Sequence, residues 1–576
     1  MNLIALITTA ASALLGTYLL GYLVLRACTR FNDPECWAFS GISGIALLAG
    51  IAFAAFGCST FSRLAYVGPT VMLAVLSIMV LKRRRRPLFP QRPPAWLLAG
   101  ITLWLALLCV QLISLVYTGA FWYGDWWMHY DIAQFYLGLR DPHVRYFGMY
   151  TIVSRPPLFN LAATFYLAVF GNSFAVYQVV SLIPGLAVLG PLILLARPKR
   201  ASLLVALVAL NPYLVNQLLY PWPKLLASAL VLAGLSCYLA YRSTTDVVKR
   251  SYLIGSGIWI GLAILTHTST VIYAIGMAID YLWLHRRNLR HALAVSFVVV
   301  APAVGVMAPW LIWSAHLYGP AAIITSTPTV AATGRSVSPV GWAWDRLSTM
   351  VGTLFPIPAV MLVGLVTHVP ARIAAYVWSP LRDAWLRSYY SMLPGAFTYT
   401  LTVCVCVYLW LRRRRRPVHH GLPLLLINTL AVTGFLGGIL LQPGLNAQGV
   451  AGEGMAPLVL LFLVVAVAVI EELGPRLRWV VLSLTALEFL ATRGVHTMIL
   501  ALGLFNGMDE GNLKLKQQYQ LLFARDVVGG AWPLVSAIAI LAYVVLFHVA
   551  WASEDMDAAP VVPGSPKRTA EAGYGI

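Results

Sequence analysis

The sequence predicts an all-α, polytopic membrane protein with about fifteen transmembrane helices and juxtamembrane helices in its outer loops. Of its 576 residues, 60% are hydrophobic and only 10% are charged, whereas a soluble domain has about 25% charged residues. Apolar runs of about twenty residues recur along the chain, which is the length that crosses a bilayer as a helix. A soluble core stops growing at about 250–300 residues, so this much apolar surface is expected to face lipid.

Short basic clusters separate the apolar runs and set the orientation. They are Lys82–Arg86, Arg197–Arg200, Arg286-Arg287 and Arg412–Arg416. The positive-inside bias places all four in the cytoplasm. Basic clusters in cytoplasmic turns therefore account for much of the formal net charge of +20. Nucleic acid is not an expected partner, because no cluster is interleaved with the aromatic residues that stack on bases.

With the basic clusters on one side, the N-terminus lies outside and fifteen spans follow. The predicted spans are 3–26, 38–56, 64–81, 95–117, 174–196, 201–219, 224–241, 251–267, 268–284, 292–315, 397–411, 421–441, 456–471, 479–500 and 530–551.

One apolar run, 157–170, has only fourteen residues, which is short for a span. If it crossed the membrane, the cluster 197–200 would lie outside, against the positive-inside bias. We therefore predict an interfacial or re-entrant helix there. The sequence has no visible internal repeat and no pattern of paired broken helices.

The layout divides the chain into five parts. We expect extra N-terminal transmembrane helices in 1–94, a transmembrane core with a first outer loop (118–173) in 95–315, a second outer loop in 316–396, C-terminal transmembrane helices in 397–551, and a disordered cytoplasmic tail in 552–576. Both outer loops are rich in Trp, Tyr and Pro, which favours the membrane interface.

The first outer loop begins with the string Phe121-Trp-Tyr-Gly-Asp-Trp-Trp-Met-His-Tyr-Asp-Ile-Ala-Gln134, directly after a predicted span. In a helix, Asp125 and His129 are at i and i+4 and share a face. A carboxylate and an imidazole there are suited to general base and positioning roles, or to binding a divalent cation such as Mg²⁺ or Mn²⁺. The alternative is that Asp125 caps a helix and the aromatic residues anchor the interface. Both readings stay open.

Two further features follow in the same loop. Ser154-Arg155-Pro156-Pro157-Leu158 leads into the short apolar run, and that run ends in Phe-Gly-Asn-Ser. The two prolines are tolerated in the first turn of a helix, and the Arg155 side chain can simply reach the headgroups.

Together these pieces resemble the GT-C superfamily, polytopic glycosyltransferases that use polyprenyl-phosphate-linked sugars. The resemblance is closest to the bacterial branch with the aminoarabinose transferase of lipid A and the protein O-mannosyltransferases. Asp125 matches the acidic position held to be catalytic, His129 a later polar position, and Arg155-Pro156-Pro157 the basic Pro-Pro step. Trp126 replaces the second acidic residue of the family motif, which puts a metal site in doubt, and about ninety residues precede the part that resembles the family.

The resemblance, which runs from about 95 to 310, suggests further substrate-binding residues on the outer side. Tyr220-Pro-Trp-Pro-Lys224 resembles a Trp-Pro-Lys step of bacterial members, and Lys224 is suited to neutralise a lipid phosphate. His267 lies at another outer turn where members carry polar or basic residues, and Glu453 lies in the late outer loop where they bind the donor. Headgroup contact for Lys224 and a structural role for His267 are the alternatives.

The resemblance implies transfer of a sugar from a polyprenyl-phosphate donor, undecaprenyl phosphate in a bacterium, at the outer (periplasmic) face of the inner membrane. The acceptor would be a glycan, a glycolipid or a protein, and the metal dependence stays open. A transporter or flippase of a lipid-linked glycan is the alternative, and it would carry functional charges near the midplane and paired broken helices. A non-catalytic scaffold would tolerate replacement of Asp125.

Overall fold

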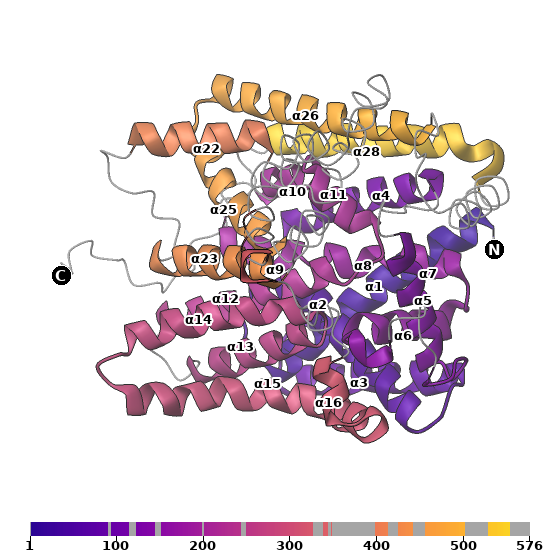
Figure 1. The fold of residues 1–576 in the computed structure, drawn as a ribbon. Coiled ribbons are helices and arrows are strands. Elements are labelled where there is room, and N and C mark those ends of the chain that lie inside the picture. The colour runs from indigo at the N-terminus through magenta and orange to yellow at the C-terminus, as the bar shows by residue number, and fades with distance from the viewer. Residues whose placement is uncertain are drawn as a thin grey trace.

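The computed structural model describes residues 2–89, 94–114, 123–143, 151–197, 201–243, 249–325, 338–341, 343, 347, 398–412, 424–441, 456–501 and 528–552. Within these ranges the chain forms helices and no strands, and most of the long helices run side by side (Figure 1). The predicted all-α polytopic fold is confirmed. Glu453, the tail 553–576 and most of 316–396 lie outside the described residues.

Each of the fifteen predicted spans overlaps one or more helices of the described residues. The helices of the first half are α1 (Leu3–Cys28), α2 (Asp33–Gly57), α3 (Arg63–Arg83), α4 (Ala95–Ser114), α5 (Tyr123–Tyr136), α6 (Leu158–Phe170), α7 (Phe174–Val180), α8 (Leu182–Leu186), α9 (Leu189–Ala196), α10 (Ala201–Ala209), α11 (Pro212–Leu219), α12 (Lys224–Ser243) and α13 (Lys249–Ile264). Those of the second half are α14 (Val271–Leu284), α15 (Leu289–Tyr318), α16 (Pro320–Thr325), α22 (Tyr399–Arg412), α23 (Leu424–Leu441), α25 (Ala456–Glu472), α26 (Pro475–Ala501) and α28 (Trp532–Ala552).

Not every predicted span is long and apolar enough to cross a bilayer by itself. Seven stretches of the described chain pass both tests, and the bent pair α10 and α11 adds an eighth if it is one span. Shorter apolar helices cover several of the other intervals. The number fifteen therefore stays a prediction.

Glycines bring the first helices into backbone contact. A Cβ atom added at Gly21 of α1 would lie 1.9 Å from the Ser40 carbonyl oxygen of α2, and one at Gly44 would lie 2.0 Å from the Thr17 carbonyl oxygen. Small residues allow this approach between helices in a membrane, where close packing rather than the hydrophobic effect holds helices together. The N-terminal helices are thus packed tightly into the bundle, and α2 also contacts α6 and α9.

The predicted span 201–219 is bent. The axes of α10 and α11 meet at 78°, because Asn211 caps α11 through its side chain and Pro212 occupies the first turn, where it has no N–H to continue α10. Every side chain of α11 is buried. Irregular backbone at membrane depth is tolerated when protein surrounds it in this way. The predicted straight span 201–219 is therefore a bent pair of short helices.

The short helix α6 is confirmed. Its side chains from Leu158 to Leu167 are all buried, and it packs against α2, α3, α5 and α7. Protein therefore surrounds most of α6, and neighbouring helices hold it in place. Its interfacial or re-entrant position in the membrane stays a prediction.

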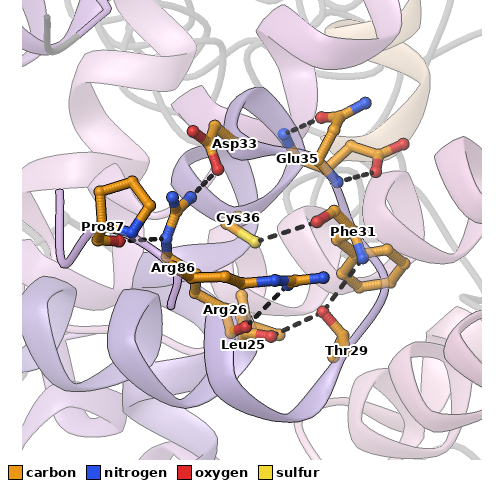
Figure 2. Close-up of polar contacts among 10 residues, drawn as sticks. Leu25, Arg26, Thr29, Phe31, Asp33, Glu35, Cys36, Arg86 and Pro87 are labelled. Carbon is orange, nitrogen blue, oxygen red and sulfur yellow. Dashed lines mark hydrogen bonds and ion pairs between the residues drawn. The ribbon is translucent and has the colours of Figure 1, made fainter. Parts of the chain in front are cut away.

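The first and second predicted cytoplasmic turns meet in a polar cluster. Arg26 forms an ion pair with Asp33 and donates from Nε to the Pro87 carbonyl oxygen at 2.9 Å (Figure 2). Arg84 donates to the Ala27 carbonyl oxygen at 2.9 Å, and Arg86 donates to the Arg26 carbonyl oxygen at 3.3 Å. The basic cluster after α3 is thus fixed to the turn after α1.

The same end of the bundle includes the start of α13. Asn32 and Glu35 form a capping box at the start of α2, and the Tyr252 hydroxyl of α13 donates to Glu35 Oε1 at 2.8 Å. Three turns that the charge pattern places in the cytoplasm therefore lie together. The grouping agrees with the predicted topology.

Helices α12 and α14 run in the same direction and are bonded at both ends. At their starts, Lys224 Nζ lies 2.8 Å from His267 Nε2, just before α14. At their ends, Asp280 accepts hydrogen bonds from the Tyr238 hydroxyl at 2.6 Å and from Arg242 at 2.9 Å. Since α13 returns the chain between them, all three helices keep the alternation expected of consecutive spans.

Candidate functional site

The predicted catalytic loop begins with helix α5. Met128, Ile132 and Tyr136 are fully buried at a spacing of four residues, so this face of α5 packs on the protein. His129, beside them, is 2% exposed. Asp125 is the third residue of α5, one turn before His129, and its side chain lies outside the described part of the structure.

His129 is oriented by α6. Its Nδ1 lies 2.8 Å from Oδ1 of Asn160, which is fully buried, and the amide nitrogen of Asn160 faces the Pro156 carbonyl oxygen at 3.5 Å. The Asn160 oxygen is therefore the acceptor and His129 Nδ1 carries the proton. In the neutral ring, Nε2 is then the basic nitrogen, as a second hydrogen-bonding partner fixes the tautomer of a functional histidine.

The position of Arg155 relative to His267 follows from the backbone on either side of it. It follows the 3-10 turn Ile152–Ser154 in an extended conformation and is half-buried. Two prolines later, the Leu158 N–H donates to the Leu265 carbonyl oxygen at 3.0 Å. This bond joins the start of α6 to the turn after α13, so Arg155 and His267 belong to one region.

Three side chains of the turn 220–224 contact one another in sequence order. The rings of Tyr220 and Trp222 are 4.8 Å apart in an edge arrangement, and the Lys224 ammonium lies 4.8 Å from the centre of the Trp222 ring. Such a cation–π contact holds the charge without neutralising it. Tyr220 is therefore a buried support for Trp222, and Trp222 in turn supports Lys224.

Lys224 and His267 are hydrogen-bonded. A lysine ammonium has only donors, so Nζ donates to His267 Nε2 at 2.8 Å, and Nδ1 then donates to Ser269 Oγ at 2.7 Å. A longer contact of 3.3 Å from the Ser269 N–H to Nδ1 fits the other tautomer. The shorter bonds decide for a neutral ring protonated at Nδ1.

Electrostatics place four of the predicted residues in one cluster. Burial lowers the pKa of His267 well below its usual value, and the charges of Lys224, Arg155 and His129 lower this pKa further. His267 lies in the turn between α13 and α14, outside both helices. These three side chains are therefore close enough to act on the His267 ring, and we call the four together the outer cluster.

A small pocket lies beside the outer cluster, with a cavity volume of about 10 Å³, enough for roughly one water molecule. Its lining residues are Lys224, Ala227, Ser228, His267, Ser269, Thr270, Tyr273 and Pro457. They come from the start of α12, from the turn before α14 and the first turn of α14, and from the start of α25, so the starts of three helices lie near one another. A helix start carries partial positive charge and unpaired N–H groups, so the arrangement suits an anion.

Three contributing residues were not predicted. Asn160, Trp222 and Ser269 orient His129, Lys224 and His267 respectively. Asn160 was visible as an amide inside an apolar run, where a polar residue needs a partner. Nothing in the sequence pairs Ser269 with Lys224, 45 positions away, before the chain is folded.

Glu488, a carboxylate within the predicted span 479–500, is bonded to the start of α22. Its two carboxylate oxygens accept hydrogen bonds from the backbone N–H groups of Tyr399 at 2.7 Å and Thr400 at 3.0 Å. A carboxylate at a helix start is favourable because it meets unpaired N–H groups and the positive end of the helix dipole. Glu488 thus caps α22, and this role is structural.

A metal site does not form from the described side chains. They contain no group of three or more His, Cys, Asp or Glu residues that could hold an ion. His129 uses Nδ1 on Asn160, and Asp131, the other carboxylate of α5, is paired with Arg140 at 3.1 Å. Asp125 and His129 as metal ligands therefore remain a prediction, and no chemical step below uses a metal.

The fold and the outer cluster define a multi-pass helical membrane protein with a cationic, partly buried site at one end of its bundle. Residues 154–313 match the sequence profile of the dolichyl-phosphate-mannose-protein mannosyltransferase family. The match confirms the resemblance to GT-C glycosyltransferases for this segment, which contains Arg155, Tyr220, Lys224 and His267 and begins after His129.

One solved structure is also similar to the chain. It is that of ArnT from Cupriavidus metallidurans bound to undecaprenyl phosphate, with 14% sequence identity, a TM-score of 0.44, and coverage of 79% of this chain and 76% of that one. No curated protein sequence matches the chain.

Proposed function

We propose that the protein is a membrane glycosyltransferase that moves a sugar from a polyprenyl-phosphate-linked donor to an acceptor at the outer face of a bacterial inner membrane. The observation that carries this proposal is the outer cluster beside a small polar pocket at three helix starts. Most of the cluster lies in the segment that matches a family named for a dolichyl-phosphate-linked donor.

The pocket wall has the chemistry that suits the phosphate of the donor. Lys224 supplies a compact charge there, and Ser269 supplies a hydroxyl group. The donor phosphodiester carries one negative charge, and departure of the sugar leaves a phosphate monoester with one more. Fixed positive groups stabilise that developing charge in the transition state. Arg155 is the second cation of this site.

Asp125 is the proposed general base. Its carboxylate takes the proton from the acceptor hydroxyl, whose oxygen forms the new bond to the anomeric carbon as the bond from that carbon to the phosphate oxygen breaks. The proton ends on Asp125 and the electron pair on the lipid phosphate, so the step is balanced. A single displacement of this kind inverts the anomeric centre, through a transition state with oxocarbenium character.

The test is a transfer assay with purified full-length protein, a panel of radiolabelled polyprenyl-phosphate sugars and membrane extract as the source of acceptors. We expect Asp125→Asn to lower transfer at least about 100-fold, since general bases contribute about 10²–10⁴. Asp131→Asn is the matched control, because Asp131 lies on the same helix but pairs with Arg140. Near-normal transfer by Asp125→Asn would reject the assignment of the base.

One observation favours the transporter alternative. The broken span of α10 and α11 is a feature of transporters, whose sites lie at discontinuous helices. Such proteins carry a second broken helix in the corresponding repeat, and the described residues contain one bent pair. In the same assay, donor binding without turnover in wild type and in Asp125→Asn would shift the assignment to a lipid-glycan transporter.

A further inference from the structure

His267 combines two features that rarely occur together. It is surrounded by positive groups, yet its Nε2 is the acceptor of a hydrogen bond from one of them. An imidazole accepts at Nε2 only when this nitrogen is deprotonated. If Nε2 gained a proton, two positive groups would lie 2.8 Å apart, and the Lys224 ammonium would have to move away.

The surroundings of His267 fix the ring and its tautomer. Ser269 Oγ accepts from Nδ1 at 2.7 Å, and the His267 backbone carbonyl accepts from the Thr270 hydroxyl at 2.8 Å and from the Thr270 N–H at 3.2 Å. The ring therefore has one orientation, with Nε2 toward α12. That orientation is the one that Lys224 uses.

Two of the contacts that Lys224 makes differ in kind. The Trp222 ring attracts the ammonium from one side but does not fix its direction, whereas the hydrogen bond to His267 does. Lys224 is also a wall of the pocket. The four-carbon stem of lysine is flexible, so an acceptor that orders it lowers the entropy lost on binding an anion.

The charged and titratable groups that face His267 come from several elements. They are Lys224 at the start of α12, Arg155 after the 3-10 turn, and His129 from α5. From α14 and α25, Tyr273 and Pro457 line the same pocket. The described groups that act on the ring are thus positive or neutral, and all of them oppose its protonation.

We propose that His267 is a positioning residue that, as a neutral acceptor, holds the Lys224 ammonium at the pocket wall for a phosphate group, and that protonation of His267 releases Lys224. The inference rests on the proposed function and adds a regulated element to its site. The depressed pKa of His267 agrees with it, because the ring stays neutral through mildly acidic conditions.

Three substitutions separate this role from its alternatives. Glutamine offers a neutral acceptor, leucine fills the space without one, and lysine imitates a protonated ring. We expect His267→Gln to keep the affinity for polyprenyl phosphate within about threefold, and His267→Leu and His267→Lys to weaken it about tenfold or more, as expected for a lost charged hydrogen bond. The measurement is binding of radiolabelled polyprenyl phosphate to the purified full-length protein.

Each alternative gives another pattern, and each would overturn the proposal. If the ring acts as a cation toward phosphate, His267→Lys retains affinity and His267→Gln loses it. If the ring only fills space, His267→Leu retains affinity. His285 supplies the matched control at the other end of α14, where its Nδ1 lies 2.9 Å from the Tyr281 carbonyl oxygen. The same three substitutions of His285 are expected to leave affinity unchanged.

A second measurement does not depend on any ligand. The pKa of His267 is lower in the folded than in the unfolded chain, where it is about 6.5. As pH falls through that value, the unfolded state takes up a proton that the folded state refuses, so stability is lost. We expect the unfolding temperature of wild type to fall more between pH 7.5 and 5.5 than that of His267→Gln.

Parallel pH curves for the two proteins would mean that His267 is not held neutral, and would overturn the proposal. The pH measurement also distinguishes failure of the His267 proposal from failure of the proposed function. If wild type transfers no sugar from any donor, the proposed function fails, while the pH curves still decide the state of His267.

Discussion

The two ends of helices α12 and α14 each carry a basic side chain from α12, but the partners of the two side chains differ. At the inner end, Arg242 donates to a fully buried carboxylate, Asp280, which also accepts from Tyr238. At the outer end, Lys224 donates to a neutral imidazole and lies near Arg155 and His129. The inner cation is neutralised by the protein. The outer cation donates to a neutral imidazole, and the charges of Arg155 and His129 act on that same ring.

The comparison extends to the other inner turns. Arg26 pairs with Asp33, and the basic residues after α3 donate to backbone carbonyl oxygens of the turn after α1. Such pairing stabilises a fold, whereas clustering of like charges costs stability and persists where function needs it. The following predictions test whether the two ends really divide stability and function in this way.

The largest effect is expected from Lys224→Met. It removes the positive charge at the pocket wall, and loss of one group that stabilises transition-state charge costs about 10²–10³ in rate. The matched control is Lys249→Met, which removes an ammonium 4.7 Å from the Tyr241 ring at the inner end. Transfer rates per folded protein should separate the two variants, and equal loss in both would contradict the division.

Arg242→Met is expected to act on stability instead. It leaves the Asp280 carboxylate buried without its cation, and breaking such a pair costs about 3–5 kcal/mol when fully buried. Arg242 is 23% exposed, so we expect about 2–3 kcal/mol, with transfer per folded protein unchanged. Thermal unfolding is the measurement, and exposed Arg286→Met is the control. A lost activity with an unchanged unfolding temperature would reverse the assignment of the inner pair.

Asn160→Leu should have an intermediate effect at the outer end. It fits the buried site but removes the acceptor that orients His129, so the ring loses its tautomer and direction. We expect kcat to fall about tenfold with little change in donor affinity, as for groups that orient a functional residue. Thr164→Val is the control on the next turn of α6, where the hydroxyl donates to the Ala133 carbonyl oxygen. Equal kcat in both variants would remove His129 from the site.

The smallest effect is expected from Glu488→Gln. The amide oxygen still accepts from the start of α22, so only the charge is lost, and we expect a cost of about 0.5 kcal/mol in stability. Transfer should not change. A large loss of activity would show that this carboxylate has a role beyond capping.

Much of the fold follows from apolar length and basic clusters. The starts of the predicted spans 224–241, 268–284 and 456–471 lie at one pocket, and the predicted inner turns near Arg26, Arg84 and Tyr252 are bonded to one another. Length and charge are properties of short segments, so they can be predicted locally. The bend at Asn211-Pro212 also has a sequence signal, because a cap residue followed by proline is typical of a helix start.

The contacts that make the site work could not be predicted. The bond between Lys224 and His267 joins residues 43 positions apart, and that between His129 and Asn160 joins residues 31 apart. Each requires two helices to pack at one angle and rotation. Lys224, His267 and His129 could be identified as candidates because they are polar residues at the ends of apolar segments. Which of them contact one another could not be predicted.

The bonds at both ends of α12 and α14 also fix the rotation of α14 about its own axis relative to α12. An α-helix turns 100° per residue, so one residue inserted between His267 and Asp280 would swing one end of α14 by that angle relative to the other. Asp280 could keep Arg242, or His267 could keep Lys224, but not both. The orientation of the outer cluster thus depends on an ion pair at the opposite end of the same two helices.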